Sequence, residues 1–368
     1  MEMNMNHIMT GNQIRWWRTS FGKEEGIEIC NSIEHEHISQ GIVTADFEQK
    51  LARVLDIPYV VATTSGSIAI LMSLMAAGIR PYDEVIVPNR TWIATAHAPL
   101  ILGAKVRLSD VESIRPLMDV TQIENLITSK TKAIIPVHLN GRSVDMREVH
   151  RIAEKNDLVV IEDTAQSLGS RNEDGFLGTQ SDMGCFSLSL PKIISTGQGG
   201  FVVTKDEHLY KKLLAIRTHG VSDVINAQWT HPGFNFRFTD ILASIGIHQI
   251  ERLPERIETV KKIYKHYETA IQDLPFIKLI PVDIKKGEIP IYVEVLCDER
   301  EELIKFLSAQ NIQTRPFYPD LNLASYLENA GRFPNSEVFG LQGLCLPSGS
   351  AQTMDDIDRV IGALMKFK

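Results

Sequence analysis

The chain has 368 residues, of which 43% are hydrophobic and 23% are charged, as in an ordinary globular protein. This length suits two domains, or one large domain with a smaller one beside it. The net charge of −8 argues against non-specific binding to nucleic acid, and no apolar run approaches the ~18 residues of a membrane-spanning helix.

From about residue 57 to 205, short apolar runs rich in β-branched residues alternate with helical patterns. This alternation predicts an α/β fold with a mainly parallel sheet flanked by helices, whose ligand site lies at the carboxyl ends of the strands. The helical patterns cover 68–77, 120–129 and 146–156. The expected strands are 59–62, 84–87, 105–108, 133–137, 158–161 and 201–204.

A smaller α+β unit is expected in the last third of the chain. Residues 239–271 are typical of a long helix with breaks, one of them at Pro254. A strand over 289–296, a helix over 300–310 and a final helix over 353–367 follow. We expect a large domain over 1–250, whose N-terminal segment packs on the small domain, and a small domain over 251–368.

The first run with chemical potential is Thr63-Thr64-Ser65-Gly66-Ser67, directly after a predicted strand. A small-residue turn that opens a helix offers free N–H groups and a positive dipole end to an anion, and Gly66 lets the backbone come close. A plain Ser/Thr cap on the helix remains an alternative.

Two aromatic-containing segments are less specific. Trp92, in Asn89-Arg90-Thr91-Trp92, follows a predicted strand and could stack on a flat ring, although tryptophan is more often core filler. The run 233–240 precedes a helix, and Thr239 or Asp240 could simply cap it.

Asp163 ends the apolar strand 158–161 and would face the ligand crevice. Opposite a pyridine nitrogen, such a carboxylate would keep the ring protonated and make it an electron sink. Capping of the next helix is the alternative use.

Lys192 lies in an apolar, small-residue stretch and is followed by Gly197-Gln198-Gly199-Gly200. Apolar surroundings lower a lysine pKa, as a Schiff-base nucleophile requires. A solvated loop lysine fits these flanks poorly. The four features follow one another along the chain and match the parts of pyridoxal phosphate. The anion site suits the phosphate, the aromatic residue suits the ring face, the acidic strand end suits the ring nitrogen, and the lysine suits the aldehyde carbon.

These runs resemble the DegT/DnrJ/EryC1/StrS family of sugar aminotransferases, a branch of the fold-type I pyridoxal-phosphate enzymes. The resemblance covers nearly the whole chain. Its motifs include Ser65-Gly66-Ser67, 136–141, 162–166, Ser187 with Lys192, 197–200, 217–220, 233–237 and 345–347.

The resemblance implies roles for individual residues. Lys192 would carry the cofactor as a Schiff base and shuttle a proton, and Asp163 would pair with the ring nitrogen. Trp92 would stack on the ring and Gln166 would lie near its phenolic oxygen. The phosphate would be held by Ser65, Gly66, Ser67 and Ser187, and by Asn235 of the neighbouring subunit in a homodimer with shared active sites.

The implied reaction moves the amino group of L-glutamate to a keto group of a nucleotide-linked deoxy sugar, giving an amino sugar for a surface polysaccharide such as O-antigen. His219, Arg237, Arg315 and Tyr318 are candidates to meet the sugar nucleotide, with ordinary structural roles as the alternative. The chain departs from the family in having Ser67 for a threonine, Gln198 for a glutamate, and Tyr318-Pro319-Asp320-Leu321 for a Pro-Leu-His segment.

Other readings fit less well. A dehydratase branch of the family carries histidine in place of the lysine, so Lys192 argues against it, and an aminotransferase for a non-nucleotide substrate remains open. A non-enzymatic regulator is disfavoured by Lys192 with Asp163, and a Rossmann enzyme by the lack of a GxGxxG turn.

The remaining expectations concern location and metals. The four cysteines are far apart and form no CxxC pair, which predicts reduced thiols in a cytoplasmic protein and no metal site. The polar stretch 1–11 does not have the pattern of a signal peptide, and no membrane partner is expected.

Overall fold

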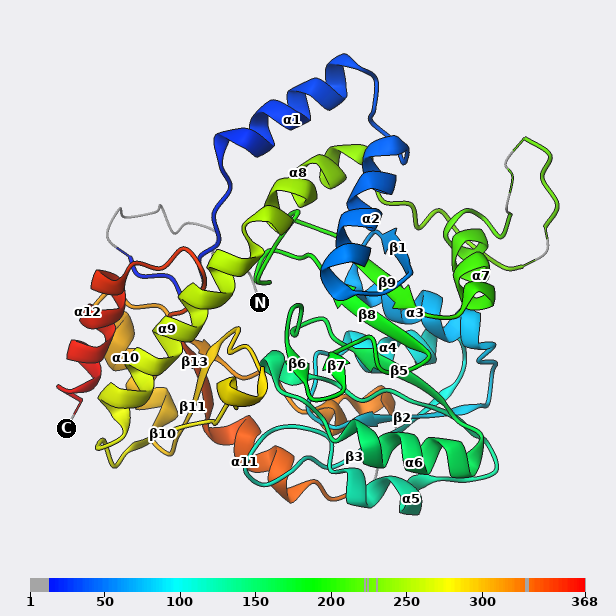
Figure 1. Cartoon of the computed structure of the whole chain (residues 1–368). Helices are drawn as coiled ribbons and strands as arrows, with labels where there is room; N and C mark the ends of the chain where they lie inside the picture. Colours follow the sequence, from blue (N-terminus) through cyan, green and yellow to red (C-terminus); the bar gives the residue numbers. More distant parts are fainter. Residues whose placement is uncertain (1–12, 222, 224, 230, 328–330, 368) are drawn as a thin grey trace.

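The computed structural model describes residues 13–221, 223, 225–229, 231–327 and 331–367. At its centre lies a seven-stranded sheet of order β1-β9-β8-β5-β4-β2-β3 (Figure 1). Only β9 runs antiparallel to its neighbours β1 and β8, so the expected mainly parallel sheet is confirmed. The strands are β1 (Tyr59–Thr63), β2 (Glu84–Pro88), β3 (Lys105–Ser109), β4 (Thr131–Ile134), β5 (Val159–Asp163), β8 (Met183–Ser187) and β9 (Gly200–Thr204).

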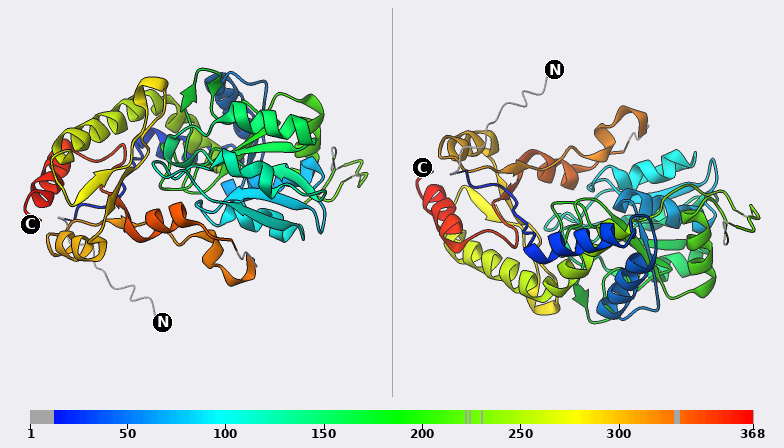
Figure 2. Two further views of the ribbon diagram at one scale, coloured as in Figure 1. Left: turned by 90° about the horizontal axis from the view of Figure 1, so that it is seen from below. Right: turned by 90° about the horizontal axis from the view of Figure 1, so that it is seen from above.

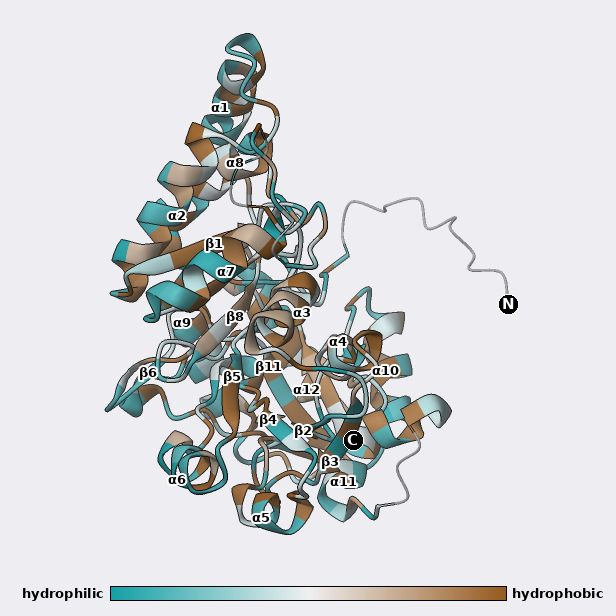
Figure 3. Cartoon of the chain, turned by 90° about the vertical axis from the view of Figure 1, so that its right-hand side faces the viewer, coloured by the Kyte–Doolittle hydropathy of each residue, from teal (hydrophilic) through white to brown (hydrophobic). Residues whose placement is uncertain are grey.

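Helices cover both faces of this sheet, because successive side chains of a strand point to opposite sides. In β1, Val61 packs in a cluster with α3, whereas Val60 and Ala62 pack with α2 and α8. The apolar strands therefore lie between two layers of helices (Figure 3). The helices of this part are α1 (Lys23–Glu34), α2 (Ile42–Leu55), α3 (Gly66–Ala77), α4 (Ala94–Ile101), α5 (Ile123–Leu126), α6 (Met146–Asn156), α7 (Glu207–Arg217) and α8 (Asp240–Glu251).

A four-stranded antiparallel sheet of order β10-β11-β13-β12 lies beside the large one, with its own apolar cluster (Figure 2). Its strands are β10 (Ile277–Leu279), β11 (Val293–Cys297), β12 (Arg315–Pro316) and β13 (Gly343–Leu346). The associated helices are α9 (Leu253–Ile271), α10 (Arg300–Ala309), α11 (Pro334–Gln342) and α12 (Met354–Leu364). The boundary near residue 250 stays a prediction.

Short elements complete the chain. A hairpin pairs β6 (Arg171–Asn172) with β7 (Gly175–Phe176), and the 3-10 turns are η1 (Val120–Gln122), η2 (Leu139–Gly141), η3 (Ile284–Lys286), η4 (Leu321–Leu323) and η5 (Ser325–Leu327). Near the N-terminus, Ile14 and Trp17 form bridges with Ile312 and Ser348 beside the small sheet. Among the described helices, none has the length and apolar composition needed to cross a membrane.

The expected long helix over 239–271 is divided at Arg252 into α8 and α9, with Pro254 in the first turn of α9, where a missing N–H costs little. Thr239 caps α8, as expected, by accepting from Leu242 N at 3.4 Å. Asp240 has another role: its carboxylate accepts from Gly41 N and Thr44 N at 2.8 and 2.9 Å and so caps α2.

Three expected elements have the wrong bounds: the helix over 120–129 and the strands over 133–137 and 289–296. The helix over 120–129 is only η1 followed by the single turn α5. The strand over 133–137 ends at Ile134 because Pro136 has no N–H for the ladder.

The strand over 289–296 begins only at Val293, because the Asn140 side chain takes the place of a strand neighbour. Asn140 Nδ2 donates to Tyr292 O at 2.9 Å, and Tyr292 N donates to Asn140 Oδ1 at 2.5 Å.

Candidate active site

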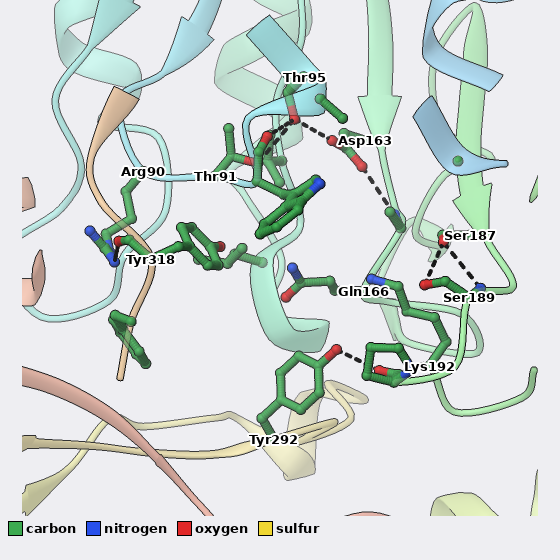
Figure 4. Close-up of a pocket in the computed structure, with 18 of the residues that line it drawn as sticks. Arg90, Thr91, Thr95, Asp163, Gln166, Ser187, Ser189, Lys192, Tyr292 and Tyr318 are labelled. Carbon is green, nitrogen blue, oxygen red and sulfur yellow. Dashed lines mark hydrogen bonds between the residues drawn. The ribbon is translucent and has the colours of Figure 1, made fainter. Parts of the chain in front are cut away.

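A cavity of about 330 Å³ lies between the two sheets, at the carboxyl ends of the central parallel strands (Figure 4). The large sheet contributes residues within 65–67, 90–95, 163–166 and 187–192, which follow β1, β2, β5 and β8. The facing wall comes from the small sheet and includes Tyr292, Arg315 and Tyr318. The position is the one expected for a ligand site in an open α/β sheet.

The N-terminus of α3 forms one end of the cavity. Ser65 caps this helix by accepting from Ile68 N at 3.2 Å, and Gly66 and Ser67 begin the first turn. A Cβ at Gly66 would lie 2.8 Å from the Cβ of Ser187, so only glycine allows the turn after β1 to approach β8 this closely. Four of the five residues predicted to hold a phosphate, Ser65, Gly66, Ser67 and Ser187, thus meet at a helix N-terminus, where anions are stabilised.

Asp163 ends β5 and is 4% exposed. Its Oδ2 accepts from Thr95 Oγ1 at 2.7 Å and its Oδ1 accepts from Ala165 N at 3.1 Å. Burial raises the pKa of the Asp163 carboxyl, while the hydrogen bond from Thr95 acts in the opposite direction. The carboxylate is therefore fixed in place and would gain from a cationic partner.

Lys192 lies in the turn after β8 and lines the same cavity as Asp163 (Figure 4). Burial lowers the pKa of its amine to about 8; the nearby Asp163 charge opposes that shift and the Arg315 charge adds to it. At pH 7 roughly a tenth of this amine is therefore neutral, far more than for an ordinary lysine, and only the neutral form can act as a nucleophile or a base.

The loop that carries Lys192 is held from the small sheet. Tyr292, which no local pattern in the sequence singled out, donates its hydroxyl to Pro191 O at 2.5 Å. Trp16, from the N-terminal segment, also lines the cavity and lies under the guanidinium of Arg315 at 4.7 Å from the ring centroid.

The remaining cavity residues predicted from the sequence are Trp92, Gln166, Arg315 and Tyr318. Trp92 is 49% exposed and forms a T-shaped contact with Tyr318, with 5.8 Å between ring centroids. Gln166 accepts from Asn140 N at 3.2 Å. Trp92 is therefore a residue of the cavity wall rather than core filler.

Asn235, His219 and Arg237 do not line this cavity within the chain. Asn235 and His219 are exposed, and Arg237 Nε donates to Asn235 Oδ1 at 2.9 Å. Their expected roles stay predictions: phosphate binding in a neighbouring subunit for Asn235, and contact with the sugar nucleotide for His219 and Arg237.

Arg90 and Asp320 form a buried ion pair that the sequence did not suggest. Arg90 Nη2 also donates to Tyr318 O at 2.8 Å, and the guanidinium lies 5.0 Å from the Phe317 ring centroid. Asp320, one of the departures from the family pattern, therefore anchors the segment that bears Tyr318 to the end of β2. The two residues lie 230 positions apart, so no local signal could have paired them.

The cavity residues fit pyridoxal phosphate. The α3 N-terminus suits the phosphate, Trp92 the ring face, the buried Asp163 carboxylate a protonated ring nitrogen, and Lys192 the aldehyde. This combination defines the class of protein as an enzyme that attaches its cofactor through a lysine.

The family model described as the DegT/DnrJ/EryC1/StrS aminotransferase family matches residues 20–365, so the chain belongs to this family. It is an aminotransferase, and the expectation of pyridoxal phosphate as cofactor is confirmed.

Similar proteins agree with this assignment. The GDP-perosamine synthase of Escherichia coli O157:H7 is 34% identical, over 89% of this chain and 91% of its own length. The GDP-perosamine synthase of Caulobacter vibrioides is 35% identical, over 89% and 90%. The crystal structure of DesV from S. venezuelae in complex with a ketimine intermediate has a TM-score of 0.89 at 28% identity, covering 94% of each chain.

Proposed function

We propose that the protein transfers the amino group of L-glutamate to a keto group of a nucleotide-linked deoxy sugar, producing 2-oxoglutarate and an amino sugar nucleotide. The observation that carries the proposal is Lys192 and Asp163 on the walls of one cavity, beside a helix N-terminus. Similarity to the two GDP-perosamine synthases supports a sugar nucleotide as acceptor and makes a GDP-linked sugar the first to test.

Each residue has a separate task in this reaction. When bound, the cofactor supplies an electron sink for the charge left on the substrate carbon. Lys192 Nζ takes the proton from the α-carbon of glutamate, and in the second half-reaction it delivers a proton to the sugar carbon that receives the nitrogen. Asp163 would hold the positive charge of the protonated ring nitrogen.

The substrate contacts we propose come from two sources. Arg315 and Tyr318 line the cavity in this chain and would meet the sugar nucleotide there. His219 and Arg237 lie outside it and would act in the active site of a second subunit.

A homodimer is part of the proposal. Ile225, Trp229 and Phe234 are 89%, 80% and 66% exposed, which is unusual for three large apolar side chains in one stretch. Asn235 follows directly and is exposed as well. Burial of this stretch against a second copy would bring Asn235 to the partner's phosphate site.

The proposed location is the cytoplasm, where thiols are kept reduced and nucleotide sugars are available. All four cysteines are free, and Cys185, Cys297 and Cys345 are buried. The proposed product would serve the synthesis of a surface polysaccharide such as O-antigen.

The two half-reactions test this proposal separately. Purified protein with pyridoxal phosphate is first mixed with L-glutamate, then with GDP-, UDP- and dTDP-linked 4-keto-6-deoxy and 3-keto-6-deoxy sugars. We expect glutamate to remove the visible absorbance of the cofactor and one of the keto sugars to restore it. A sugar consumed without gaining nitrogen would instead indicate a dehydratase, and restoration only by a free keto sugar would indicate a non-nucleotide acceptor.

A further inference from the structure

Thr95, in the first turn of α4, is buried and lies beside Asp163 in the wall of the cavity (Figure 4). Its Oγ1 donates to Asp163 Oδ2 at 2.7 Å. A hydroxyl bonded to an ionised carboxylate makes a charge-assisted hydrogen bond, which is stronger than one between neutral groups. This contact spans 68 positions of the chain and joins the turn after β2 to the end of β5.

The hydrogen bonds around Thr95 define the direction of its proton. Its Oγ1 lies 3.0 Å from Thr91 Oγ1 and 3.1 Å from Trp92 O. A hydroxyl carries one proton and accepts through its lone pairs. Thr95 directs its proton to the Asp163 oxygen, which is nearer and charged. Its hydroxyl oxygen therefore accepts a hydrogen bond from Thr91, and the donors run in order from Thr91 through Thr95 to Asp163.

The second oxygen of Asp163 is also fixed, because Ala165 N donates to Oδ1 at 3.1 Å. One donor on each oxygen sets the plane of the carboxylate and leaves its other lone pairs free for a ligand. Without the Thr95 proton, the buried carboxylate would lose its only side-chain donor among the hydrogen bonds of the described residues. Burial already raises the pKa of Asp163, so the ionised form depends on such donors.

We propose that Thr95 is a positioning residue for Asp163, which keeps the carboxylate ionised and aimed at the ring nitrogen of pyridoxal phosphate. The inference rests on the role of Asp163 in the proposed function. Thr95 also lies three positions after Trp92 and contacts its carbonyl. Because its one proton is donated to Asp163, the Trp92 carbonyl is a close neighbour of the hydroxyl and not its hydrogen-bond partner.

The test compares cofactor affinity in Thr95→Val, which keeps the shape but lacks the hydroxyl, and Thr95→Ser, which keeps the hydroxyl. The dissociation constant of pyridoxal phosphate is measured by titrating cofactor-free protein and following tryptophan fluorescence. Loss of a hydrogen bond to a charged group predicts about 10- to 100-fold weaker binding for Thr95→Val. Thr95→Ser should stay within about threefold of wild type.

The chain offers a matched control in Thr44, whose buried hydroxyl donates to Asp240 Oδ1 at 2.6 Å. Thr44→Val removes the same kind of hydrogen bond outside the cavity. Its effect on pyridoxal phosphate binding should be less than about threefold, although it lowers thermal stability. A loss as large as that of Thr95→Val would mean that the affinity reports general destabilisation.

A cofactor analogue with carbon in place of the ring nitrogen separates positioning from packing. For this analogue, Thr95→Val and wild type should bind equally, because nothing remains for Asp163 to hold. An equal loss for both cofactors, or no loss for pyridoxal phosphate, would overturn the proposal. If the valine variant does not fold, Thr95→Cys, with a weak donor, takes its place in the same comparison.

Failure of this inference is distinguishable from failure of the proposed function. Wild-type protein that does not bind pyridoxal phosphate would remove the basis of both. Wild-type protein that binds it, with Thr95→Val binding equally well, would overturn only the role of Thr95.

Discussion

The cavity wall from the large sheet and the wall from the small sheet are held in place by different kinds of contact. Asp163, Lys192 and the start of α3 each follow a strand directly, so the backbone of the sheet positions them. Tyr292 and Tyr318 depend on side chains of the large sheet, through Asn140 and Arg90. We call the large-sheet side the cofactor wall and the small-sheet side the substrate wall, after their proposed roles. The position of the cofactor wall is therefore encoded locally in the sequence, whereas the substrate wall relies on a few long-range polar contacts.

The largest effect is expected on the cofactor wall, in Lys192→Ala. Loss of the amine removes both the covalent attachment and the proton carrier, so transamination should fall about 1,000-fold or more. The visible absorbance of the bound cofactor should disappear with it. Lys130→Ala, at an exposed position, serves as the control, and full activity of Lys192→Ala would contradict the assignment.

On the substrate wall, Asp320→Ala should destabilise the protein because it leaves the Arg90 guanidinium buried without its carboxylate. Breaking a buried pair in this way costs roughly 3 kcal/mol in free energy of unfolding. Urea denaturation of the two proteins measures the difference. Glu173→Ala breaks an exposed pair with Arg147 and should leave stability unchanged, so equal effects would mean that burial is not what matters.

The pH dependence of cofactor attachment links the two walls. Attachment requires the neutral amine of Lys192, whose pKa of about 8 predicts a rate that rises with pH and levels off above that value. Because the positive charge of Arg315 lowers this pKa, Arg315→Met should move the midpoint to higher pH. Stopped-flow absorbance over pH 6 to 10 measures the rate of attachment. A midpoint unchanged by Arg315→Met would show that the Arg315 charge does not lower the pKa of the Lys192 amine.

The smallest effect is expected for Tyr292→Phe, which removes the hydrogen bond from the small sheet to Pro191 O. Loss of one neutral hydrogen bond predicts about 1 kcal/mol lower stability. Thermal unfolding measures this, with Tyr82→Phe, at a 75% exposed position, as the reference. A reduction no greater than that of Tyr82→Phe would show that the Lys192 loop is held by the large sheet alone.

The cofactor wall could be predicted because its residues stand next to recognisable strands. Ser65, Asp163 and Lys192 each occur in a short run whose context already indicates a use, and the cavity brings them together. The roles of Thr95 and Arg90 could not be predicted, because their partners lie 68 and 230 positions away and depend on the pairing of whole strands.

The fold follows the same division. The alternating apolar runs predict the parallel sheet correctly. The strand expected over 289–296 starts too early, because β11 begins at Val293 and the preceding residue, Tyr292, pairs with Asn140 of η2 instead of a strand. Hydrophobic patterning does not distinguish a segment paired by a strand from one paired by an asparagine side chain.

That asparagine has a consequence for how the active site can change. Asn140 pairs with both backbone groups of Tyr292, and a Cβ at the next residue, Gly141, would collide with Ile289 O at 1.8 Å. This contact fixes the distance between the two sheets at a point that precedes the substrate-wall residues in the sequence. Substitutions at Phe317 or Tyr318 would therefore alter the proposed acceptor side of the cavity while the contact between Asn140 and Tyr292 keeps the two sheets in place.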